Sequence, residues 1–189
     1  MSILEIIAVI VSALAVWATT RRVLWCWPLG LASVALYGRV FFDAKLYSDM
    51  GLQAVFAAFL AYGWFHWWRG VRDEGAVVVV PLSTQAAIAG LVAGAVGSVA
   101  LGWAMARWTD AALPYVDATL AAFSLVAQYW TARKHIENWW LWIAVDVAYT
   151  AMYAVKDLCL TAGLYAGFIV LAVLGLRSWR AGTPAVTLP

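Results

Sequence analysis

Charged side chains are scarce in this chain, and their scarcity excludes most soluble folds. Lys, Arg, Asp and Glu make up 12% of the 189 residues, whereas 66% are hydrophobic and the mean hydropathy is +0.85. A soluble domain carries about 25% charged and about 45–50% apolar residues. Lipid is therefore the expected solvent for most of the protein surface. The formal charge of +2 is too small to indicate a nucleic-acid partner.

Cysteine is also rare, and no catalytic motif is present. Cys26 and Cys159 lie near opposite ends of different apolar segments, which argues against a disulfide, and neither spacing resembles a metal site. The sequence contains no Ser/His/Asp set, HExxH, P-loop or GxGxxG. We therefore expect a membrane protein that is not an enzyme and that needs no cofactor, metal ion or ATP.

What the chain has in quantity is apolar segments long enough to cross a bilayer. A spanning helix needs about 20 mostly apolar residues. Short polar breaks separate seven candidates, at roughly 3–20, 24–42, 48–68, 82–105, 115–131, 138–155 and 159–177. The first lacks a basic start and a cleavage site, so we expect a retained helix rather than a signal peptide. The sequence thus predicts an all-α polytopic membrane protein, with a disordered tail after Arg180.

Many residues in the segment 3–70 have an identical residue 112 positions further along the chain. Ser12, for example, corresponds to Ser124. The matched pairs include Thr19 and Thr131, Trp27 and Trp139, Tyr37 and Tyr149, Gly51 and Gly163, Gly63 and Gly175, and Trp67 and Trp179. We predict two three-helix repeats, at 1–70 and 111–182, joined by a loop and linker helix at 71–110 and followed by a tail at 183–189. Since three spans invert the chain, the linker helix restores its direction and gives a 3+1+3 arrangement of parallel repeats. Such repeats usually enclose a substrate path at their interface.

The basic residues predict an orientation in the membrane. With the N-terminus outside, the inner loops and tail hold eight of them: Arg21, Arg22, Arg69, Arg72, Arg133, Lys134, Arg177 and Arg180. The outer side holds four, namely Arg39, Lys45, Arg107 and Lys156. Because cytoplasmic loops carry an excess of Lys and Arg, we expect the N-terminus outside and the C-terminus in the cytoplasm.

The strongest candidate for a functional residue is Asp146, eight residues into the sixth segment. An Asp near mid-bilayer costs about 2.5–3.5 kcal/mol on insertion scales, so it should face the bundle interior or a wet cavity. Helical spacing aligns it with Trp139, Trp142, Tyr149 and Tyr153. An aromatic stripe around one carboxylate suits an organic cation or a flat heteroaromatic ring. The alternative is a structural Asp bonded to a neighbouring helix.

Gln53, early in the third segment, is a second candidate. A buried amide in lipid needs a hydrogen-bond partner, which a ligand or a neighbouring helix could supply. The first repeat has no acidic residue at the position that corresponds to Asp146, so any binding site formed by the two repeats should be asymmetric.

Three stretches together carry a more specific pattern. They are Trp27-Pro28-Leu29-Gly30 through Tyr37 to Phe41-Phe42; Leu46-Tyr47-Ser48-Asp49-Met50-Gly51-Leu52-Gln53 with Tyr62-Gly63-Trp64 and Trp67; and Asn138-Trp139-Trp140-Leu141-Trp142-Ile143-Ala144-Val145-Asp146 with Tyr149, Tyr153 to Lys156 and Leu164-Tyr165. In these stretches the chain resembles the nicotinamide riboside transporter (Pnu) family of bacterial vitamin transporters. Because the stretches lie in both repeats, the resemblance covers most of the chain.

The resemblance implies a fold similar to full-length sugar-efflux (SWEET) transporters, a homotrimer, and facilitated diffusion without a coupling ion, with cytosolic phosphorylation trapping the vitamin. It also implies binding roles for Gln53, for Trp140 in the double-Trp motif, and for position 146, where the family has Asn. Asn both donates and accepts hydrogen bonds, whereas ionised Asp only accepts and adds charge. Nicotinamide riboside contains a cationic pyridinium, which tolerates this change, but thiamine is a cation too.

We therefore expect an inner-membrane uniporter for nicotinamide riboside that contributes to NAD biosynthesis. Its expected substrate-binding residues are Gln53, Trp139, Trp140, Trp142, Asp146 and Tyr149. The expected partners are the vitamin, membrane lipid and further copies of the chain. Two alternatives remain: the same fold could carry thiamine or another nucleoside-like vitamin, or the chain could be a non-transporting membrane receptor.

Overall fold

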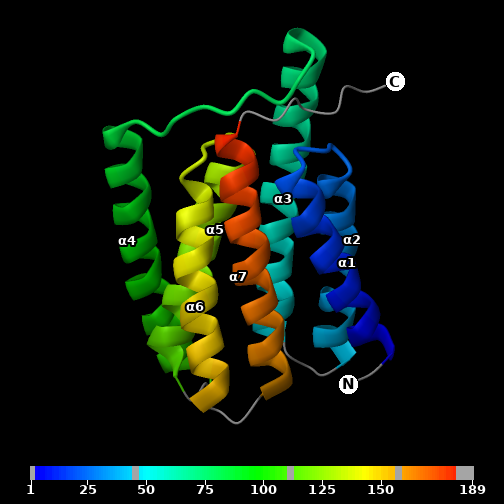
Figure 1. Ribbon diagram of the computed structural model, residues 1–189. Helices are drawn as coiled ribbons and strands as arrows, with labels where there is room; N and C mark the ends of the chain where they lie inside the picture. Colours follow the sequence, from blue (N-terminus) through cyan, green and yellow to red (C-terminus); the bar gives the residue numbers. More distant parts are fainter. Residues whose placement is uncertain (1–2, 44–46, 110–112, 156–158, 182–189) are drawn as a thin grey trace.

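The protein is described by a computed structural model covering residues 3–43, 47–109, 113–155 and 159–181. Within these residues the chain forms seven α-helices that stand side by side (Figure 1). They are α1 (Ile3–Thr20), α2 (Cys26–Asp43), α3 (Tyr47–Glu74), α4 (Thr84–Trp108), α5 (Pro114–Ala132), α6 (Asn138–Val155) and α7 (Cys159–Arg180). The all-helical prediction is confirmed. The predicted tail at 183–189 lies outside the described residues.

The largest difference from the predicted boundaries concerns α3. The polar stretch from Arg69 was expected to end the helix, but α3 continues through Arg72 to Glu74. Charged residues are compatible with a helix once it has left the bilayer. The helix ends at Gly75, which has a φ of 75°, a backbone conformation that glycine adopts without steric cost. The Gly75 N–H donates to the Val71 carbonyl at 2.8 Å.

Local sequence signals explain where the other helices begin and end. The Ser83 hydroxyl accepts from the Ala86 N–H at 3.2 Å and caps α4. Pro114 occupies the first turn of α5, where its missing N–H costs no hydrogen bond. Arg22 and Lys134 follow α1 and α5 with φ values of 56° and 64°. These two residues are related by the 112-residue offset, so the chain makes the same left-handed turn after both helices.

Six helices form a closed ring and the seventh lies outside it. Going round the ring, contacts join α1 to α2, α2 to α3, α3 to α5, α5 to α6, α6 to α7 and α7 back to α1. Helix α4 packs on α5 at the edge of the bundle (Figure 1). Small residues allow this close approach, since a side chain at Gly94 would meet the Phe123 ring and one at Gly102 would meet the Tyr115 ring.

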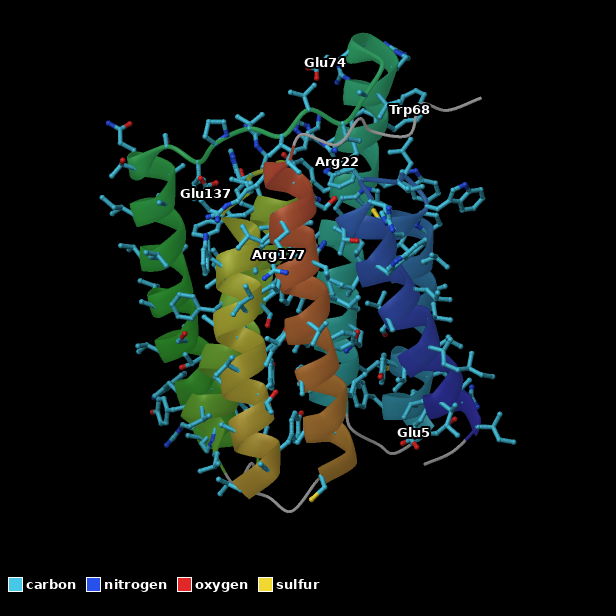
Figure 2. All side chains as sticks on the ribbon, viewed as in Figure 1. Glu5, Arg22, Trp68, Glu74, Glu137 and Arg177 are labelled. Atoms are coloured by element: carbon cyan, nitrogen blue, oxygen red, sulfur yellow. The ribbon has the colours of Figure 1, made fainter. Side chains whose placement is uncertain are left out.

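The end of the bundle where α1, α3, α5 and α7 finish carries most of the basic residues. Arg22 and Glu74 lie at this end and Glu5 lies at the opposite end (Figure 2). The segment from α3 to α4 crosses this end and is anchored there. The Val80 N–H donates to the Lys134 carbonyl at 3.0 Å, and the Leu82 N–H donates to the Glu137 carboxylate at 3.0 Å.

Length and mean hydropathy qualify three of the described helical stretches as membrane spans. They are Ile3–Thr20, Thr84–Trp108 and Thr161–Arg180. The remaining helices contain Trp, Tyr and charged residues such as Asp146, which lower their mean hydropathy. Residues of this kind are tolerated at membrane depth where they face a bundle interior.

Candidate functional site

A row of four tryptophans crosses the ring near its basic end. Trp27 meets Trp67 edge-on at 5.1 Å between ring centroids, Trp67 meets Trp179 at 5.9 Å, and Trp179 meets Trp139 edge-on at 5.4 Å. All four side chains are at most 3% exposed. The row runs from α2 through α3 and α7 to α6, so it fills the interior of the ring at this level.

Two hydrogen bonds from this row join helices that are far apart in sequence. The Trp67 indole N–H donates to the Thr131 carbonyl on α5 at 3.2 Å, and the Trp179 indole N–H donates to the Thr19 carbonyl on α1 at 3.1 Å. The two bonds are equivalent, because the 112-residue offset relates the donor Trp67 to Trp179 and the acceptor Thr19 to Thr131. The outer indoles, Trp27 and Trp139, match as well, since both have buried N–H groups with no partner among the described residues.

Close packing against glycine fixes the outer tryptophans in place. A Cβ atom added at Gly63 would overlap the Trp27 indole, and one added at Gly175 would overlap the Trp139 indole. The glycines are again an offset-related pair. Trp139, which was predicted to bind substrate, is therefore a fully packed component of the row.

Asp146 lies on α6, about two turns from the row towards the opposite end of the bundle. Its side chain is 5% exposed. None of the described hydrogen bonds or ion pairs involves its carboxylate, although its backbone carbonyl accepts from Thr150 at 2.7 Å. The expectation that Asp146 faces inward holds. A buried carboxylate without a described partner is costly unless a ligand, water or proton offsets its charge.

A cluster of tyrosines continues from Asp146 in the direction away from the tryptophan row. Tyr149 stacks on Tyr165 of α7 at 4.6 Å and on Tyr153 at 5.9 Å, and Tyr153 stacks on Tyr165 at 5.4 Å. Asp146 and Tyr37 of α2 both lie within electrostatic range of Tyr165. The interior at this level is thus walled by phenol rings next to a single carboxylate, which suits a flat or cationic ligand.

Serines support two of these tyrosines in equivalent ways. The Tyr37 hydroxyl lies within hydrogen-bonding range of Ser12, and the Tyr149 hydroxyl within range of Ser124. Ser12 also shares a 2.5 Å hydrogen bond with Ser33 of α2. Both Ser–Tyr pairs follow the 112-residue offset, so hydroxyl groups from both halves of the chain reach the interior.

Trp142 lies between the tryptophan row and Asp146. Its indole N–H donates to the Thr131 hydroxyl at 3.2 Å, and that hydroxyl donates to the Asn138 side-chain oxygen at 3.0 Å. The bonds hold the half-buried Trp142 ring in one orientation. The position that corresponds to Trp142 in the first half is Gly30, and the position that corresponds to Asp146 is Val34. The two halves therefore differ in both bulk and charge.

Of the remaining predicted residues, Trp140 lies apart from this group, and no described hydrogen bond or ring contact joins Gln53 to it. Trp140 is 54% exposed and its ring lies beneath the Arg180 guanidinium at 5.4 Å, so it covers the outside of the basic end. Gln53 is half-buried on α3. Sequence reasoning did not assign a binding role to Tyr165 or Tyr37. The inward position of Tyr37 could have been suspected from the repeat, because Tyr37 corresponds to the predicted Tyr149.

Within the described residues, a closed ring of helices encloses a buried carboxylate without a described partner among stacked aromatic rings, which is an arrangement typical of membrane transport proteins. The comparison with known families agrees. Residues 2–181 match the family described as nicotinamide mononucleotide transporters, and the chain belongs to that family.

Individual relatives carry different vitamins. The riboflavin/roseoflavin transporter RibM of Streptomyces davaonensis is 31% identical over 163 residues, which cover 84% of this chain and 76% of the relative. The nicotinamide riboside transporter PnuC of Escherichia coli K12 is 27% identical over 178 residues, which cover 79% of this chain and 73% of the relative. The chain thus belongs to a family of multi-pass vitamin transporters rather than enzymes.

The fold has a solved counterpart. The crystal structure of the vitamin B3 transporter PnuC superimposes with a TM-score of 0.75 over 94% of this chain and 80% of that one, at 23% identity. The seven helices described above therefore have the PnuC transporter fold.

Proposed function

We propose that the protein is a uniporter that lets nicotinamide riboside equilibrate across the bacterial inner membrane, where cytosolic phosphorylation traps it for NAD biosynthesis. The observation that carries this proposal is the Asp146 carboxylate, buried without a described partner beside Tyr149 and Tyr165. A pyridinium ring would offset the charge of Asp146 and stack on the phenol rings. The ribose hydroxyls would find partners among the serine and tyrosine hydroxyls, as with Ser12 and Ser124.

In this proposal the binding residues are Asp146, Trp142 and Tyr149, with Trp139 supporting them from the row. Gln53 and Trp140 keep in this proposal the binding roles that the family resemblance implies. The two halves act as parallel three-helix repeats in a 3+1+3 arrangement similar to SWEET transporters. The offset-related contacts of the tryptophan row support this arrangement. Assembly as a homotrimer is part of the same proposal.

Riboflavin is the second candidate, favoured by the relative that transports it at 31% identity. The flavin ring is neutral and flat, so it could stack on the tyrosines and donate its imide N–H to Asp146. Thiamine is a third ligand to test, because its thiazolium is a cation. Charge distinguishes riboflavin from the other two ligands.

Uptake should be passive. No second acidic side chain is buried with Asp146 in the described residues, and a coupling ion generally needs its own site. Purified protein in empty liposomes should bring radiolabelled nicotinamide riboside to equal concentrations inside and outside. Imposed proton or sodium gradients should not change that end point. Accumulation driven by either gradient would contradict uniport, and binding without any uptake would favour the receptor alternative.

The N-terminus should lie outside and the C-terminus in the cytoplasm. Cys159 is exposed at the start of α7 and Cys26 is buried, so Cys159 is a native probe of the proposed outer side. A membrane-impermeant maleimide should label it in intact cells. In a Cys159→Ser background, Glu74→Cys at the opposite end should label only after the membrane is opened. The reverse pattern would contradict the orientation taken from the basic residues.

A further inference from the structure

An exposed group of aromatic and basic side chains lies on the outside of the bundle where α3 meets α5. We define the seam cluster as Phe59, Tyr62 and His66 of α3 with Tyr129 and Arg133 at the end of α5. Tyr62 and Tyr129 are 38% and 42% exposed. This cluster is separate from the ring interior, and the proposed transport site does not use it.

The rings of the seam cluster form a continuous stack. Tyr62 stacks on two of them, on His66 at 5.9 Å with an interplanar angle of 9° and on Tyr129 at 6.2 Å and 17°. Phe59 meets the Tyr129 ring edge-on at 6.4 Å, on the side away from the basic end. The stack joins α3 to α5, and its two tyrosines are both partly exposed.

Positive charge gathers at one end of this stack. An Arg133 guanidinium N–H points to the Tyr62 hydroxyl at 3.4 Å, which is a long contact that leaves most of its five donors free for other partners. Arg69, Arg133 and Lys134 all lie within electrostatic range of His66. The acidic group that also lies in range is Glu74, about two turns further along α3.

The corresponding seam between α7 and α1 is built differently. The offset relates Tyr62 to Leu174 and His66 to Ser178, so no ring stack can form there. Arg21, which corresponds to Arg133, lies instead over the Trp17 ring at 5.6 Å. Only the α3–α5 seam therefore combines a ring stack with an arginine beside it among the described residues. The α7–α1 seam serves as an internal control.

We propose that the seam cluster binds the headgroup of an anionic phospholipid. The lipid phosphate would accept hydrogen bonds from Arg133 and the Tyr62 hydroxyl beside His66, while an acyl chain would lie along Phe59. Basic sites between helices near the cytoplasmic surface are suited to such headgroups. The bound lipid joins α3 to α5, and these helices belong to different three-helix units. Its occupancy therefore restrains movement of one unit against the other.

Lipid retention by the purified full-length protein tests the proposal. The protein is mixed with equal amounts of phosphatidylglycerol and phosphatidylcholine, and the bound lipids are counted by native mass spectrometry. Wild type should retain phosphatidylglycerol preferentially. Arg133→Gln should reduce that preference about fivefold, the effect of one basic residue near an anionic surface, and Arg21→Gln should leave it unchanged. Both variants should keep the wild-type melting temperature.

Three outcomes would overturn the proposal. Wild type could retain the two lipids equally, Arg21→Gln could reduce the preference as much as Arg133→Gln, or an excess of inorganic phosphate could displace phosphatidylglycerol, which would indicate recognition of free phosphate. The effect on movement rests on the proposed transport function. Uptake into phosphatidylcholine liposomes with and without phosphatidylglycerol measures it separately, so failed uptake would contradict transport without altering the binding result.

Discussion

Asp146→Asn should weaken binding of nicotinamide riboside about 10- to 150-fold, since a hydrogen bond to a charged group contributes about 1.5–3 kcal/mol. The amide keeps the shape of the side chain and removes its charge. The loss of binding affinity should therefore be confined to cationic ligands. Thiamine should lose affinity with nicotinamide riboside, while riboflavin and a neutral nucleoside should be nearly unaffected or bind more tightly.

Dissociation constants for the four ligands on wild type and Asp146→Asn provide the measurement. Asp73→Asn is the matched control, because it removes one negative charge from the exposed end of α3, where Asp73 pairs with Arg72 at 3.3 Å. It should leave all four constants unchanged. Equal losses for every ligand in Asp146→Asn would mean that the carboxylate is structural, and the proposal of a cationic substrate would then be wrong.

The second large effect concerns the packing of the tryptophan row. Gly63→Ala and Gly175→Ala each place a methyl group inside the space of a buried indole, Trp27 in one case and Trp139 in the other. A buried indole held on both sides has little room to shift. Overpacking of this kind costs about 1–3 kcal/mol, so both variants should melt at clearly lower temperatures and lose transport.

Two glycines at equivalent helix positions provide the control. A Cβ added at Gly51 or Gly163 meets nothing within 4 Å, and Ala is favoured over Gly inside a helix by about 0.5–1 kcal/mol. Gly51→Ala and Gly163→Ala should therefore keep or slightly raise the melting temperature. If all four variants behaved alike, close contact with the indoles would not be what requires glycine at 63 and 175.

The helices could be predicted because their signals are local. Apolar length, polar breaks and helix-compatible residues placed every helix start within two residues of its observed position. The end of α3 differs from the prediction because the polar residues from Arg69 do not interrupt helical hydrogen bonding, and the backbone leaves the helix at Gly75, which has a positive φ. Polarity shows where a span leaves lipid, not where its hydrogen bonds stop.

The interior could be predicted only in part, because helical spacing fixes a face but not its neighbours. The stripe containing Asp146 and Tyr149 was expected to face inward, and both side chains lie in the interior. Trp140, one residue from Trp139, instead lies on the outside of the bundle, under Arg180. The contribution of Tyr165 depends on how α7 packs against α6, and no pattern within one helix contains that information. The binding roles of all these residues stay predictions.

The two indole bonds that cross between the three-helix units are copies of one bond, Trp67 to Thr131 and Trp179 to Thr19. In a dimer of identical units they would be a single self-complementary contact formed twice. Such a dimer would also have to bury two carboxylates at the level of Asp146, and like charges in a poorly solvated interior repel. Covalent fusion through α4 removes that constraint, since Val34 can stand where symmetry would demand a second acid. One chain thus keeps both symmetric hydrogen bonds while its interior is acidic at position 146 and apolar at position 34, as the proposed ligand, with one charged ring and one neutral sugar, requires.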